Sequence, residues 1–203
     1  MASCCDDVCS VEVVQGKQRK TLKIVLAINL VMFVVVVAAS VYGRSTSLLA
    51  ESFDDLGDVL VYGISLFVVS KGVAAKSRVA LFKGLLIMAA ALVVVFQIIY
   101  KLAYPELPLF EVMGVFSVLG LVANSVCLLL LWRRRDDDIN MSSVWECSRN
   151  DIASNLSVFV AGSLVWLTAS GWPDLLVATA LVILLLRSSL RVISNSVRTL
   201  KTA

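Results

Sequence analysis

Six apolar stretches, each of about 20 residues or more, constrain the fold of this chain more than any other feature. They cover roughly residues 22–43, 47–70, 78–101, 108–132, 142–169 and 173–196. Composition agrees, because 59% of the residues are hydrophobic and the mean hydropathy is +0.91, far above that of a soluble domain. Backbone in lipid must satisfy its own hydrogen bonds, and the alternating pattern of a barrel is missing. The sequence therefore predicts an all-α polytopic membrane protein with six transmembrane helices.

The basic residues between these stretches predict how the chain is oriented. If the six spans alternate in direction, every Lys and Arg except Arg44 and Lys101 falls near one side of the membrane. Cytosolic loops carry the excess of Lys and Arg, so both termini are predicted to be cytosolic. The expected location is a cell membrane crossed several times, and a short six-span chain fits a bacterial inner membrane.

The second span carries four acidic residues at membrane depth: Glu51, Asp54, Asp55 and Asp58. Charge at this depth costs several kcal/mol and is rarely accidental. Asp54 and Asp58 are four residues apart, which places their carboxylates on one helix face about 6 Å from each other. Glu51 shares that face, whereas Asp55 is turned about 100° away and is expected to line a pathway or its rim. Paired carboxylates inside a membrane need a partner, and a divalent cation or protons can supply it.

The fifth span offers a second polar face, on which Cys147, Asp151 and Asn155 follow one another at four-residue spacing. Asp58 and Asp151 would lie about 18 Å and about 14 Å from the cytosolic ends of their spans, at a rise of 1.5 Å per residue. The two carboxylates could meet at a similar depth if the second and fifth helices are neighbours. Asn155 could replace Cys147 as a ligand, but we expect its amide to hydrogen-bond a neighbouring helix instead.

These motifs resemble those of the cation diffusion facilitator family of metal transporters, in its transmembrane domain only. The segment from Ser47 to Asp58 resembles the acidic second-span signature of the family, and Cys147-x-x-x-Asp151 resembles its fifth-span His-x-x-x-Asp pattern. The resemblance extends over roughly residues 20–200. It also includes Asn29, Asn124 and the sixth-span segment Gly171-Trp-Pro-Asp174.

The resemblance implies a metal transport site made of Asp54, Asp58, Cys147 and Asp151, with Cys147 in place of the usual His. It implies proton-coupled efflux of divalent transition metals from the cytosol by alternating access, with no enzymatic reaction and no cofactor. One thiolate and three carboxylates suit zinc, and the sulfur also admits cadmium. Because ligands bind metal only when deprotonated, metal and protons compete for them. The implied partners are a metal cation, protons and the lipid bilayer, and no nucleic acid.

The resemblance also frames the domain organisation. We expect residues 21–200 to form the six-helix cation-efflux domain, with no C-terminal cytosolic domain after it. That missing domain dimerises many family members, so the sequence leaves open whether two copies form a homodimer. Residues 1–20 are expected to be a cytosolic tail whose Cys4, Cys5 and Cys9 either capture a soft metal or take no part. Secondary candidates for metal binding are Glu51, Asn155, Cys4, Cys5 and Cys9.

Two other function classes compete with transport. An intramembrane aspartyl protease is associated with a Gly-x-Gly-Asp motif, but Asp55-Leu-Gly precedes Asp58, so the first Gly is missing. A membrane metal sensor or scaffold would use the Cys-rich tail and would bind metal without moving it across the membrane.

Overall fold

Six α-helices make up the part of the chain that the computed structural model describes, which is residues 16–67, 73–132 and 139–202. They are α1 (Gly16–Tyr42), α2 (Thr46–Phe67), α3 (Val73–Ala103), α4 (Phe110–Trp132), α5 (Ile139–Thr168) and α6 (Trp172–Thr202). No strand occurs within these ranges. The predicted all-α fold with six helices is confirmed.

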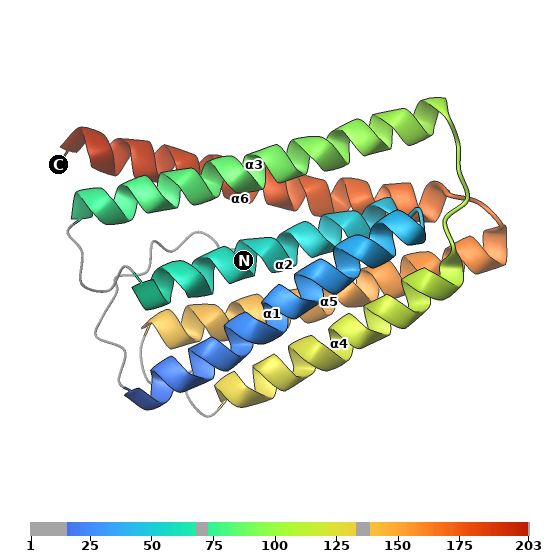
Figure 1. Cartoon of the computed structure of the whole chain (residues 1–203). Helices are drawn as coiled ribbons and strands as arrows, with labels where there is room; N and C mark the ends of the chain where they lie inside the picture. The colour runs from blue at the N-terminus through green and yellow to red at the C-terminus, as the bar shows by residue number, and fades with distance from the viewer. Residues whose placement is uncertain (1–15, 68–72, 133–138, 203) are drawn as a thin grey trace.

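Each helix runs antiparallel to the one before it, and the six form an elongated bundle (Figure 1). We call the end where α1 begins and α6 ends the proximal end, and the opposite end the distal end. The α1–α2, α3–α4 and α5–α6 connections all lie at the distal end. This even number of passes is the arrangement that places both ends of the helical region on one side of a membrane.

The described basic residues follow the same division. Arg44 and Lys101 belong to the distal end, at the α1–α2 turn and in the last turn of α3. Most of the others are in the proximal parts of their helices, among them Lys20, Arg149 and Arg198, whereas Arg187 lies in the middle of α6. The positive-inside rule then predicts that the proximal end faces the cytosol.

Several helices extend past the apolar stretches that predicted them. α3 begins at Val73, so most of the basic segment up to Arg78, expected to be a connection, is helical instead. α3 and α6 have 31 residues each, or about 46 Å at 1.5 Å per residue, which exceeds a hydrocarbon core of about 30 Å. Ala, Lys and Arg are good helix formers, and nothing in the water layer forces a helix to stop at the lipid boundary.

Five of the described helices are long and apolar enough to cross a membrane, namely α1, α3, α4, α5 and α6. α2 does not meet that criterion, because Glu51, Asp54, Asp55 and Asp58 lie within its 22 residues. It contacts α1, α3, α5 and α6 and lies in the interior of the bundle (Figure 1). The neighbouring helices therefore shield its acidic residues from lipid, and the chain folds as a polytopic membrane protein.

The bundle consists of a ring of four helices and a flanking pair. In the ring, α1 contacts α2 and α4, and α5 contacts α4 and α2. α3 and α6 pack closely on each other, and the pair rests on α2 and α5 (Figure 1). Gly84 permits the close α3–α6 approach, because a Cβ there would lie 2.8 Å from Ile193 Cγ1.

Apolar side chains occur both inside and outside the bundle. Residues such as Val36, Leu48 and Val158 form the buried core between the helices. Large side chains such as Phe96 and Leu129 are exposed on the outside. Such an exterior suits a hydrocarbon solvent, in which apolar groups carry no cost, and it agrees with the membrane location.

Candidate functional site

A continuous buried polar stripe runs along α2. It is formed by Ser47, Glu51, Asp55, Asp58 and Tyr62, each no more than 4% exposed. Their spacing of four, four, three and four residues keeps them on one helix face. The cost of charge in lipid explains why this face turns inward. The acidic face of α2 is unfavourable in lipid, so α2 folds with this face toward the interior of the bundle.

The acidic residues of α2 are not equally buried. Asp58 is 3% exposed, and its Oδ2 accepts a hydrogen bond from the hydroxyl of the fully buried Tyr62, one turn further along. Asp54 is only partly buried. Asp55, expected to line a pathway or its rim, is 4% exposed and belongs to the buried stripe. A spacing argument from Asp54 alone could not show this, because the orientation of α2 is set by its four neighbours.

α5 supplies the opposite side of the site. Asp151 and Asn155 are buried there, and α5 contacts α2, so the assumption that the two helices are neighbours is correct. The Asn155 side-chain amide donates to Glu51 Oε1 on α2 and to the Asp151 carbonyl oxygen on its own helix. The predicted interhelical hydrogen bond of Asn155 is thereby confirmed.

α4 makes room for this contact through Gly120. A Cβ at Gly120 would collide with the Asn155 side-chain amide, so only glycine allows the amide to occupy this position between α4 and α2. Gly120 on α4 therefore leaves the space in which Asn155 on α5 hydrogen-bonds Glu51 on α2. Such an interhelical amide bond is a common way for helices to lock together within a membrane.

The site concentrates negative charge. The Asp151 carboxyl group on α5 lies within electrostatic range of all four carboxyl groups of α2. Glu51 Oε2 and Asp151 Oδ2 are buried and accept no hydrogen bond from the described residues. Five carboxyl groups in one interior need a compensating positive charge, which a metal cation or protons can provide. The arrangement is chemically suited to exchange one for the other.

Comparison with known proteins identifies the family. The family model described as the cation efflux transmembrane domain matches residues 22–201, nearly the whole chain. The chain belongs to the cation efflux family. This confirms the resemblance to the cation diffusion facilitators that the motifs of the second and fifth spans predicted, and with it the multi-pass membrane location.

Two curated relatives of this cation efflux chain are bacterial. The metal cation efflux system protein CzcD of Cupriavidus metallidurans and the cation efflux system protein CzcD of an Alcaligenes species are each 24% identical to it over 203 aligned residues. Each alignment covers 90% of this chain but only 64% of the relative. The chain therefore spans less than two thirds of the length of the relatives it matches.

Some of the predicted metal ligands of this family member lie in the described part of the structure and others do not. Asp54 and Asp58 lie on α2 and Asp151 lies on α5, two helices that are in contact. Cys147 lies on α5 one turn before Asp151, but its side chain is outside the described part. Cys4, Cys5 and Cys9 also lie outside the described residues. Within the described ranges, no three His, Cys, Asp or Glu side chains are grouped as metal ligands, so the four-ligand site stays a prediction.

A further polar group of this site escaped the sequence analysis. Cys127 on α4 is fully buried and packs in one cluster with Tyr62, whose hydroxyl donates to Asp58. A single Cys within an apolar stretch gives no signal of its own. Only the spacing of Gly120, Asn124 and Cys127, which repeats one buried face of α4, could have suggested that the thiol faces the acids.

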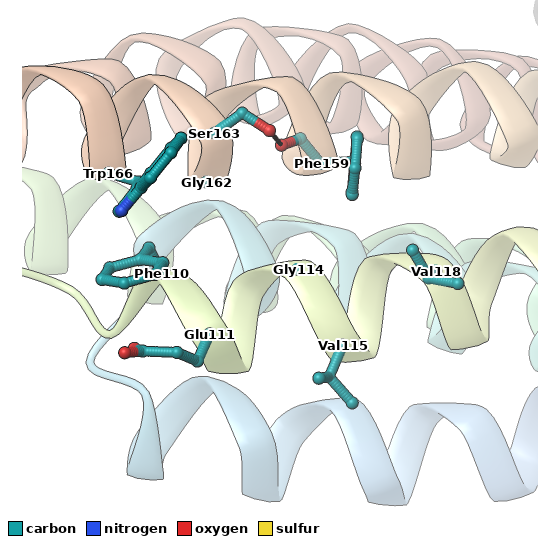
Figure 2. A pocket seen from close by; sticks show the side chains of 9 residues that line it. All are labelled: Phe110, Glu111, Gly114, Val115, Val118, Phe159, Gly162, Ser163 and Trp166. Carbon is teal, nitrogen blue, oxygen red and sulfur yellow. Dashed lines mark hydrogen bonds between the residues drawn. The ribbon is translucent and has the colours of Figure 1, made fainter.

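A separate groove between α4 and α5 lies toward the distal end, with a volume of about 610 Å³ (Figure 2). Its lining is mainly apolar, and its Ser163 hydroxyl is already bonded to the Phe159 carbonyl oxygen at 3.0 Å. Val115 and Trp166 on its rim are exposed on the outer surface of the bundle. None of the candidate ligands lines it, so this groove is not the metal site of the cation efflux domain. The lining residues are Phe110, Glu111, Gly114, Val115, Val118, Phe159, Gly162, Ser163 and Trp166.

Proposed function

We propose that this chain exports divalent transition-metal cations, zinc or cadmium, from the cytosol in exchange for protons. The observation that carries the proposal is the group of carboxyl groups between α2 and α5, in which Glu51 Oε2 and Asp151 Oδ2 are buried without a partner among the described residues. Family membership supports transport, and so do the names of the two relatives, which describe cation efflux.

The transport site consists of Asp54, Asp58, Cys147 and Asp151 in this proposal. Metal from the cytosolic, proximal side binds when these groups are deprotonated, and it lowers the negative charge of the interior. The bundle then opens the site toward the distal side, where protons displace the metal. Because an empty and fully ionised site is unfavourable inside the membrane, the site crosses only when it holds metal or protons. This is alternating access with the metal as cargo, and no reaction is catalysed.

The test measures zinc flux in proteoliposomes that contain wild type, Asp58→Asn or Asp151→Asn. Each substitution removes a charged ligand at nearly constant volume, and we expect flux to fall to background in both. Glu106→Gln is the matched control, because Glu106 is an exposed carboxylate in the distal α3–α4 connection and should be dispensable.

The outcomes separate transport from its alternatives. Full zinc flux in either Asn variant at normal expression would reject the proposed site. Zinc binding by wild type without any flux would favour the metal sensor or scaffold instead.

The metal preference is tested at Cys147. In the proposal its sulfur admits cadmium, so Cys147→His should lower cadmium flux relative to zinc flux. Competition between the two ions in the same proteoliposomes measures the ratio, with Cys127→Ser, a buried thiol on another helix, as the comparison. A cadmium-to-zinc ratio that is the same in wild type and Cys147→His would remove Cys147 from the ligand set.

A further inference from the structure

A buried polar junction closes the bundle at its distal end. It consists of Ser45, Thr46 and Ser47 at the start of α2, Lys101 in the last turn of α3, and Asp174 in the first turn of α6. We call it the distal junction. Each of these five residues is no more than 4% exposed, although their chain positions differ by up to 129 residues.

Asp174 is the centre of the distal junction. Its Oδ1 accepts hydrogen bonds from Ser45 Oγ at 2.7 Å, Ser47 Oγ at 2.6 Å and the Ser47 amide at 3.0 Å. Its Oδ2 accepts from the Thr46 amide at 2.8 Å and lies 3.5 Å from Lys101 Nζ. The first amides of a helix have no partner within that helix, so a carboxylate from α6 caps α2 from outside.

Lys101 completes the closure from α3. Its ammonium group pairs with Asp174 and also donates to the Arg44 carbonyl oxygen in the α1–α2 turn. Arg44 has a φ of 49°, the left-handed conformation that makes this turn tight. The buried ion pair of Lys101 with Asp174 joins α3 to α6. Through their hydrogen bonds to Arg44 and Ser45, the same two residues attach both helices to the α1–α2 turn. Breaking such an ion pair leaves a buried charge without its partner, so the junction opens only at a cost, which falls if water reaches the separated charges.

The junction lies in line with the acidic site. Ser47 belongs to the buried stripe of α2, one turn before Glu51, and Asp54 follows seven residues after Ser47, about 10 Å along the helix. An ion that leaves Asp54 and Asp58 along this stripe toward the distal end meets Glu51 and then the residues bonded to Asp174. Each residue of this stripe, from Ser47 to Tyr62, is buried.

We infer that Asp174 acts as the distal gate of the transporter, holding the start of α2 while the site is closed on that side and releasing it when the site opens there. The inference rests on the proposed function. Asp174 is a positioning residue in this scheme, since it acts through α2 and does not bind the metal. In this scheme zinc binding neutralises the α2 acids, and release of the junction is the step that admits distal protons.

Hydrogen–deuterium exchange of the Thr46 and Ser47 amides tests the gate directly, because their protection depends on Asp174. In wild type in lipid nanodiscs, we expect zinc to accelerate exchange of these amides. In Asp174→Asn, exchange should be about tenfold faster than in wild type, corresponding to the loss of one buried hydrogen bond, and it should no longer respond to zinc. A static cap would also give faster exchange in the variant, but it would give no zinc response in wild type.

Two further variants keep the test decisive. Ser47→Ala removes one donor to Asp174 and should give intermediate exchange even if Asp174→Asn fails to insert. Glu111→Gln removes an exposed carboxylate in the first turn of α4, at the same end of the bundle, and should leave both amides unchanged. Zinc flux by wild type together with zinc-independent exchange would overturn the gate alone. Absence of zinc flux by wild type would overturn the proposed function, and the gate with it.

Discussion

Among single residues, Tyr62 is the one that orients Asp58, a ligand of the proposed metal site. The tyrosine is fully buried, and its hydroxyl donates to Asp58 Oδ2, which fixes the orientation of the carboxylate from within the same helix. Partners behind a ligand commonly raise metal affinity in this way, because the ligand then pays less entropy on binding. The sequence analysis found Asp58 from its charge but not Tyr62, since one aromatic residue in an apolar span gives no signal.

We predict that Tyr62→Phe lowers zinc affinity about tenfold while leaving the fold intact. The substitution removes only the hydroxyl that orients Asp58, and the ring still fills its place in the cluster with Cys127. Isothermal titration calorimetry of the detergent-solubilised protein measures the change. Tyr42→Phe, at an exposed tyrosine, is the control. Equal zinc affinities in wild type and Tyr62→Phe would show that the hydroxyl does not prepare the site.

At the scale of helices, most of the fold could be predicted and most of the contacts could not. The number and type of helices follow from apolar length, because lipid leaves a spanning backbone no other choice. The helix ends were harder to predict. α3 begins at Val73, inside the basic segment before Arg78, because leaving the lipid does not by itself end a helix. The α2–α5 contact was an assumption that the Asn155–Glu51 bond now confirms.

The approach of α4 to α5 gives a prediction about stability. A Cβ at Gly120 would strike the Asn155 amide and separate it from Glu51, so Gly120→Ala should destabilise the protein by about 1–3 kcal/mol. Gly114→Ala, on the same helix, should cost little, because a Cβ there meets no atom within 4 Å. Thermal unfolding in detergent compares the two variants with wild type. Equal midpoints for the two variants would mean that Asn155 adjusts without loss.

For the whole molecule, the sequence could not reveal the contacts that join the start of α2 to α6. Asp174 meets Ser45, Thr46 and Ser47 across more than 120 positions of chain, and no local pattern reports a contact of that separation. The acids themselves were visible, since charge within an apolar span stands out. Ser47 of the distal junction and the buried acids follow one another on one face of α2. In the proposed scheme, this arrangement links opening at the distal end to metal binding in the middle of the bundle.

The proposed exchange of metal for protons predicts how a pH gradient affects transport. Protons on the distal side compete with metal for the carboxylates, so acidifying the distal compartment should accelerate zinc export, and reversing the gradient should slow it. One pH unit changes apparent zinc affinity at the distal face about tenfold for each proton that the metal displaces. A zinc indicator dye inside proteoliposomes measures the flux. A protonophore that collapses the pH gradient should abolish the acceleration. Asp58→Asn should give no gradient-dependent flux. Zinc flux that is the same under both gradients would mean that the metal moves without proton exchange, and the competition at Asp58 and Asp151 would not be the driving step.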